Sequence, residues 1–128
     1  MSIFDHRRDK RTIGREYEAI ACQYLMQQGL SKVAINYSSR FGELDLIMKD
    51  KSTWVFVEVK YRKSSQYGGA VAAVTRTKRR KILHTAYCFL NENGISSSNV
   101  AIRFDIVAIN GNNALESINW IKNIEIES

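Results

Sequence analysis

The chain has 128 residues, 45% of them hydrophobic and 25% charged, which suits one globular domain with a core of its own. Its formal net charge of +6 at pH 7 should attract polyanionic partners. No run of about 18 apolar residues occurs, and the basic N-terminus lacks the apolar stretch of a secretory signal, so we expect a cytoplasmic protein without membrane contact.

The N-terminal part of the chain predicts an arm followed by a helix. Residues 1–11 are polar and basic without periodicity, which indicates a flexible arm ahead of a single domain over residues 12–128. Apolar residues then recur at helical spacing after Thr12, a candidate N-cap, and Gly29 supplies a C-terminal stop. Glu18 lies at the margin of this apolar stripe, so its carboxylate can reach a neighbouring sheet.

Three strand candidates follow the helix. They are Leu30–Ser38, Glu43–Lys49 and Thr53–Tyr61. The polar pair Asp50-Lys51 predicts a hairpin turn between the second and third of them. The third is too apolar for a surface strand, which places it at the centre of a sheet.

The second half of the chain predicts a loop, a basic helix and further strands. Residues 62–73 carry paired serines and glycines typical of a loop, and a helix is expected from near Thr75 to Asn93 with Gly94 as its stop. Residues 100–109 form a strong strand pattern, and a last strand or extended tail is expected over residues 118–126. The order α-β-β-β-α-β predicts an α/β fold with a mixed sheet flanked by helices.

A one-sign charge block covers part of this region. No Asp or Glu occurs from Val59 through Asn91, although lysines and arginines are frequent there. A solvated helix face would mix both signs, so the block favours a phosphate-facing surface, with an ordinary solvated face as the alternative. The candidate nucleic-acid-binding residues are Arg62, Arg76, Lys78, Arg79 and Arg80.

The residues with the clearest chemical pattern are two carboxylates and a lysine. Glu58 and Lys60, two apart in a strand, point to the same face. With the hairpin centred on Asp50-Lys51, Asp45 is expected opposite Phe56 and diagonal to Glu58, close enough for two carboxylates to converge on one cation. Mg²⁺ prefers such oxygen ligands, and Lys60 could serve the attacking water. An ordinary ion pair of Glu58 with Lys60 is the structural alternative.

The few histidines and cysteines of the chain argue against zinc binding and against catalysis by histidine. The chain has two histidines, and its two cysteines, Cys22 and Cys88, fall in predicted helices without C-x-x-C spacing. A structural zinc site, a His-dependent nuclease and a Ser-His-Asp hydrolase therefore have little support. In a reducing compartment the cysteines are expected to remain thiols.

Three motifs together resemble a known family. They are Gly42-Glu43-x-Asp45-Leu46-Ile47, Val55-Phe56-Val57-Glu58-Val59-Lys60-x-Arg62 and Arg103-Phe104-Asp105. This combination is similar to the bacterial YraN-like family, an uncharacterised group that resembles the PD-(D/E)XK nucleases and, among them, the archaeal Holliday junction resolvases. The helix segment Glu18-Ala19-Ile20-Ala21 and Lys78 also match, whereas Tyr17 stands where the family usually has glycine.

The resemblance implies a restriction-endonuclease-like fold and a metal-dependent endonuclease acting on branched or damaged DNA. It places Glu18, Asp45, Glu58 and Lys60 at the catalytic positions, with the three acids as ligands of Mg²⁺ or Mn²⁺. A non-catalytic nucleic-acid-binding module and an adaptor of a DNA-processing complex are the alternatives. The sequence leaves open DNA or RNA as substrate, and symmetric cleavage of a junction would require a homodimer.

Overall fold

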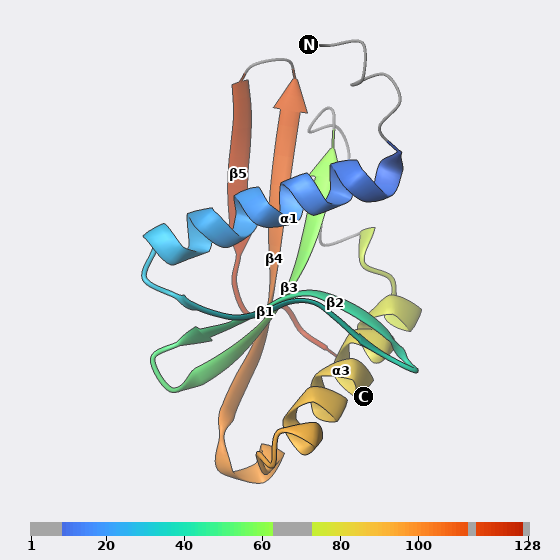
Figure 1. Ribbon diagram of the computed structural model, residues 1–128, viewed down its shortest axis with the longest axis vertical. Coiled ribbons are helices and arrows are strands. Elements are labelled where there is room, and N and C mark those ends of the chain that lie inside the picture. The colour runs from blue at the N-terminus through green and yellow to red at the C-terminus, as the bar shows by residue number, and fades with distance from the viewer. Residues whose placement is uncertain (1–8, 63–72, 113–114, 127–128) are drawn as a thin grey trace.

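A computed structural model describes residues 9–62, 73–112 and 115–126 and contains one mixed sheet with helices on both sides (Figure 1). The elements are α1 (Lys10–Gln27), β1 (Ser31–Ser39), β2 (Gly42–Asp50), β3 (Thr53–Arg62), α3 (Arg76–Glu92), η2 (Ser97–Asn99), β4 (Ala101–Asn112) and β5 (Leu115–Ile121). The strands lie in the order β1-β2-β3-β4-β5. The predicted α/β class and element order are confirmed, and β3 is central as expected.

The connections explain the mixed sheet. Neighbouring strands are antiparallel except β3 and β4, which pair in parallel from Thr53–Ala101 to Arg62–Asn110. A parallel pair needs a long crossover, and α3 lies in the chain between these two strands. The expected helix from near Thr75 to Asn93 is confirmed, because Thr75 caps α3 and Asn93 ends it.

The core has two layers, one for each helix. Ile82, Ala86 and Leu90 of α3 pack with Phe56 of β3 in one cluster of buried residues. Residues Ala21, Cys22 and Leu25 of α1 form the other cluster, with strand residues that include Val55, Val57 and Val107. Alternate residues of β3 therefore serve opposite layers, which accounts for its uninterrupted apolar pattern.

The predicted start of the first helix is wrong by three residues. The helix begins at Lys10, and its N-cap is Asp9, whose side chain accepts a hydrogen bond from the backbone N–H of Thr12 at 2.9 Å. An aspartate is at least as good a cap as a threonine, so the earlier residue takes that position. Residues 1–8 of the predicted arm and residues 63–72 of the predicted loop lie outside the described ranges.

The predicted hairpin register is also wrong. Asp50 pairs with Thr53, so the turn residues are Lys51 and Ser52, and Phe56 lies opposite Ile47 instead of Asp45. Lys51 adopts a left-handed φ of 56°, which moves the turn one residue along the chain. The register shifts by two residues, and a shift of two keeps each side chain on its original face.

The C-terminal strand differs from its predicted bounds as well. β5 ends at Ile121, and the chain beyond it is fixed by the N–H of Ile124, which donates to the carbonyl of Phe104 at 2.8 Å. Cys22 is a buried free thiol and Cys88 a partly buried one. None of the helices in the described ranges is long and apolar enough to cross a membrane.

Candidate acid and lysine site

The site begins where β2 separates from β3. The pairing between these strands ends at Leu46 and Val57, and one further step would bring Asp45 level with Glu58. Beyond this point the N–H of Val59 donates to Oδ2 of Asp45 at 2.8 Å. A side-chain carboxylate therefore replaces the strand partner that this N–H would otherwise have, and it holds Asp45 beside Glu58.

Glu58 is the most deeply buried acid of the site. Only 4% of the residue is exposed. Burial and the neighbouring Asp45 raise the pKa of its carboxyl from 4.5 to about 7, against the opposing effect of Lys78 and Lys60. The Nζ atom of Lys78 lies 3.2 Å from Oε2 of Glu58, and that of Lys60 lies 3.8 Å from the same oxygen.

Glu18 reaches the site from α1. Burial and Asp45 raise the pKa of the Glu18 carboxyl to about 7, whereas the Asn36 side chain lowers it. Asp45 therefore affects both glutamates, one from the helix and one from the sheet. The structure brings together the four residues Glu18, Asp45, Glu58 and Lys60, as the sequence predicts.

The cluster also contains buried oxygen atoms that accept no hydrogen bond. In the described ranges, four buried side-chain polar atoms lack a partner: Glu18 Oε1, Asn36 Oδ1, Glu58 Oε1 and one Arg103 nitrogen. The three oxygens belong to residues gathered around Asp45. Leaving such atoms unsatisfied is unfavourable, so this concentration indicates a place for a cation or a hydrogen-bond donor.

Asn36 is a site residue that the sequence pattern did not reveal. It lies in β1 between Ile35 and Tyr37, whose partners Leu46 and Leu44 flank Asp45 on β2. Its φ of 57° is left-handed, a conformation that asparagine tolerates better than most residues. Nothing in the strand pattern of this segment distinguishes such an asparagine from a surface one.

Lys78 is held at the site by the packing of α3. The Thr75 side chain accepts from the N–H of Lys78 at 3.2 Å and fixes the first turn. Further along α3, Thr85 forms a hydroxyl hydrogen bond with Ser39 at 3.1 Å, which attaches the helix to the turn between β1 and β2. The sequence assigned Lys78 to phosphate binding, and the structure places it against a buried carboxylate.

The other predicted phosphate-binding residues differ in their surroundings. Arg62, Arg76 and Arg80 are exposed. Arg79 is partly buried, and its guanidinium donates to the carbonyls of Val74 and Glu125 at 2.9 Å each. Arg79 thus connects the start of α3 to the C-terminal segment, while nucleic-acid binding by all of these residues stays a prediction.

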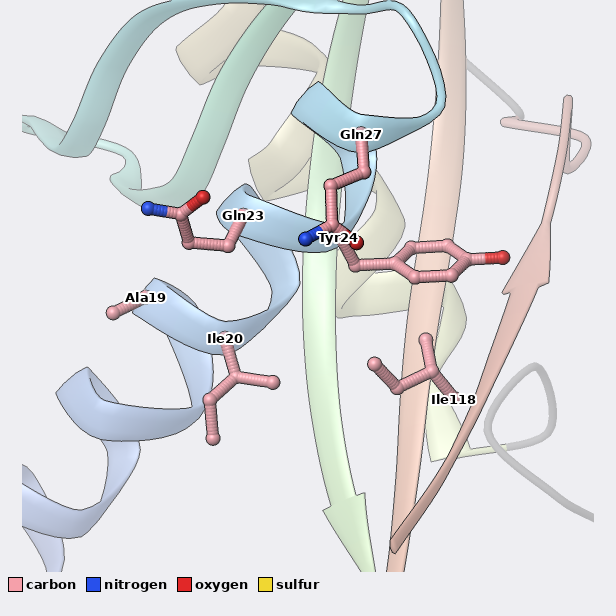
Figure 2. Close-up of a pocket in the computed structure, with 6 residues that line it drawn as sticks. All are labelled: Ala19, Ile20, Gln23, Tyr24, Gln27 and Ile118. Carbon is pink, nitrogen blue, oxygen red and sulfur yellow. The ribbon is translucent and has the colours of Figure 1, made fainter.

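Two hollows border α1, and their linings differ. One, of about 360 Å³, is lined by Arg11, Gly14, Arg15, Glu18, Asn36 and Glu43 and therefore adjoins the acid cluster. The other lies between α1 and β5, where Ile20, Tyr24 and Ile118 contribute much of the wall (Figure 2). The second lining has neither carboxylates nor cationic side chains and takes no part in the site.

No preformed cage for a metal ion is present among the described residues, because no three His, Cys, Asp or Glu side chains there are grouped as direct ligands. In this arrangement Asp45 accepts from a backbone N–H, and Glu58 is paired with lysines. The cluster is an open one, with acids that are close to each other but engaged with protein groups.

The fold and the site thus define a small α/β domain with an acid and lysine cluster where two central strands separate. The sequence profile of a family described as "Uncharacterised protein family UPF0102" matches residues 17–109, and the chain belongs to this family. This is the group that the YraN-like resemblance indicated.

Relatives of similar length share most of the chain. A UPF0102 protein of Vibrio vulnificus is 48% identical over 114 residues, which cover 89% of this chain and 92% of the relative. One of Photorhabdus laumondii is 50% identical over 111 residues, covering 87% and 85%. One of Colwellia psychrerythraea is 46% identical over 110 residues, covering 86% and 85%. Their names state no activity.

Proposed function

We propose that the protein is a metal-dependent endonuclease of the PD-(D/E)XK type that hydrolyses phosphodiester bonds in DNA, branched DNA included. The observation that carries the proposal is the Glu58 carboxylate, which is buried next to Asp45 with one oxygen unpartnered and two lysines beside the other. Buried acids crowded in this way favour a strong cationic partner.

The residues present fit a magnesium or manganese ion. Asp45 and Glu58 would ligate it, and Glu18 would do so directly or through water. Such ions bind through one or two carboxylates together with waters and substrate phosphate oxygens, so a closed cage of three protein ligands is not needed. When bound, the ion would polarise the phosphate and lower the pKa of a bound water.

The lysines of the site have separate tasks in this proposal. Lys60, on the same strand face as Glu58, orients the attacking water and takes part in its deprotonation. Lys78 comes from the other side on α3, and its ammonium balances charge that develops on the phosphate oxygens. Arg62, Arg76 and Arg80 on the exposed surface would hold neighbouring phosphates without reading the base sequence.

One contact favours a second candidate function, a nucleic-acid-binding module without catalysis. The ion pair of Lys78 with Glu58 at 3.2 Å already supplies a positive charge to the buried acid. In such a module the lysine would take the place of the metal permanently, and the surface charge alone would bind the strand.

Cleavage assays separate the two functions. The substrates are labelled junction, flap, single-stranded and duplex DNA with Mg²⁺ or Mn²⁺, and the proteins are wild type, Asp45→Asn and Lys60→Gln. We expect at least about a 100-fold loss of cleavage in each variant, because each removes a group that acts in the transition state.

The control variant is Lys32→Gln, which removes one positive charge at an exposed position of β1 outside the cluster. It should cut like the wild type, and both site variants should still bind DNA in Ca²⁺. If purified wild type binds DNA in a salt-sensitive manner but cuts none of the substrates with either metal, the binding module is the correct function.

A further inference from the structure

A groove along α1 leads to the acid cluster, and most of its lining residues lie outside the proposed catalytic site. Arg11, Gly14, Arg15 and Glu18 follow the spacing i, i+3, i+4 and i+7, so they form one face of the helix. Together with Asn36 and Glu43 on the sheet side they enclose about 360 Å³. One end of the groove therefore contains a proposed metal ligand.

Gly14 in the middle of this helix face has no internal reason to be glycine. It is not among the glycines with positive φ, and a Cβ atom added to it would meet nothing within 4 Å. Glycine destabilises a helix interior relative to alanine. Its lack of a side chain leaves this face of the helix open to the close approach of a ligand.

The charges along the groove select an anion on its helix side. Arg11 and Arg15 are exposed, and four residues of helix separate them by about 6 Å along the axis. Glu43, on the opposite wall, accepts a hydrogen bond from the Ser38 hydroxyl at 3.2 Å and repels anions from that side. Glu18 and Asn36 line the same groove, and each has a buried oxygen without a hydrogen-bond partner.

We propose that this groove is a binding site for the sugar-phosphate backbone of the DNA strand, adjacent to the phosphate that is cut. Arg11 and Arg15 pair with phosphate oxygens, and Gly14 lets the backbone approach the helix closely. The inference rests on the proposed function, since it takes the acid cluster as the place of cleavage. It adds α1 as a second phosphate-binding wall, opposite the basic first turns of α3.

Two variants of the full chain test the groove through DNA binding and melting temperature. Binding of a fluorescent single-stranded oligonucleotide and of a four-way junction is measured by anisotropy, without metal and with Ca²⁺, over a range of salt concentrations. Gly14→Ala should raise the Tm by about 2–4 °C while weakening DNA binding roughly 3- to 10-fold. Arg11→Gln/Arg15→Gln should weaken it further and reduce the salt slope by about two.

Matched variants control for charge and for helix stabilisation. Lys32→Gln/Lys122→Gln removes the same charge at exposed positions outside the groove and should lose less affinity than the arginine pair. Asn91→Ala gives a smaller helix-propensity gain of the same sign at an exposed position near the end of α3 and should leave binding unchanged.

The outcomes distinguish this inference from the proposed function. If Gly14→Ala binds DNA as the wild type does, and the arginine pair loses no more affinity than the lysine pair, the groove is not a DNA site, whatever the cleavage result. If they lose binding as expected while wild type cuts no substrate, the groove binds DNA and the nuclease proposal fails.

Discussion

Two carboxylates are buried in neighbouring strands of the sheet, and they differ in how many hydrogen-bond donors surround them. Asp105 of β4 lies level with Val57 of β3, one residue before Glu58. They are exposed by 1% and 4%, so burial alone does not distinguish them. What differs is the set of partners that each one has.

Both carboxylate oxygens of Asp105 accept hydrogen bonds. Both of its oxygens lie 3.2 Å from Nε of Arg103, and the Trp120 indole and the Asn123 N–H each donate to it at 2.9 Å. Arg103 in turn pairs with Asp50 at 2.9 Å. This network connects β4 to β5 and to the C-terminal segment, which is a structural role.

Glu58 has only the two lysine ammonium groups near one oxygen, and its other oxygen accepts nothing. Its pKa is raised to about 7 by burial and by Asp45. A buried carboxylate with an unpartnered oxygen lowers the stability of the fold unless a cation or a hydrogen-bond donor binds to it. The contrast teaches that satisfied buried acids indicate structure, whereas unsatisfied ones indicate function.

The largest expected effect comes from removing the charge of Asp105, the carboxylate that has a full set of donors. Asp105→Asn should lower the free energy of unfolding by about 3 kcal/mol, because the Arg103 guanidinium loses its main counter-charge and keeps only Asp50. Urea denaturation at pH 7 measures this. Asp50→Asn, at a partly exposed partner, is the control and should cost about 1 kcal/mol or less. Equal losses in the two variants would contradict the structural role of Asp105.

A smaller effect of opposite sign is expected at Glu58. Its pKa is about 7 in the folded protein against an ordinary 4.5, so the folded state holds a proton that the unfolded state releases between these values. Stability therefore falls as the pH rises from about 4.5 to 7. Glu58→Gln carries no charge, so at pH 8 it should be more stable than wild type by about 2 kcal/mol.

Denaturation curves of wild type and Glu58→Gln at pH 5 and pH 8 test this sign. The two proteins should be close to equal at pH 5 and differ at pH 8. Glu43→Gln is the same substitution at an exposed carboxylate of β2 and should follow the wild type at both pH values. A Glu58→Gln protein that is less stable than wild type at pH 8 would show that the acid is satisfied after all.

The sequence was sufficient for the elements and for the strand face of the site. The two-residue period of a strand placed Glu58 and Lys60 on one face, and the two-residue register error left Asp45 on the correct face. The error arose because Asp50-Lys51 and Lys51-Ser52 are both acceptable turns, and the left-handed Lys51 decides between them.

What the sequence could not supply were contacts between distant segments. Asn36 belongs to the site through a left-handed φ and a position opposite Asp45, neither of which has a periodic signal. Lys78 matched a residue of the family resemblance and was assigned to phosphate binding, but only the packing of α3 on the sheet places its ammonium beside Glu58. Sequence periodicity predicts which face of a helix or strand a side chain lies on. Contacts such as those of Asn36 and Lys78 depend on how the helices and strands pack together.

The smallest expected effect concerns Glu58, the carboxylate with an unpartnered oxygen, and comes from removing the closer of its two lysines. Lys78→Gln takes away a positive charge 3.2 Å from Glu58 Oε2, so Mn²⁺ should bind roughly 3- to 10-fold more tightly, while DNA binding in Ca²⁺ weakens. Calorimetry at pH 8 measures the metal affinity, with Arg80→Gln on the same helix as the control of equal charge. Unchanged or weaker Mn²⁺ binding in Lys78→Gln would mean that the lysine and the metal do not compete for this carboxylate.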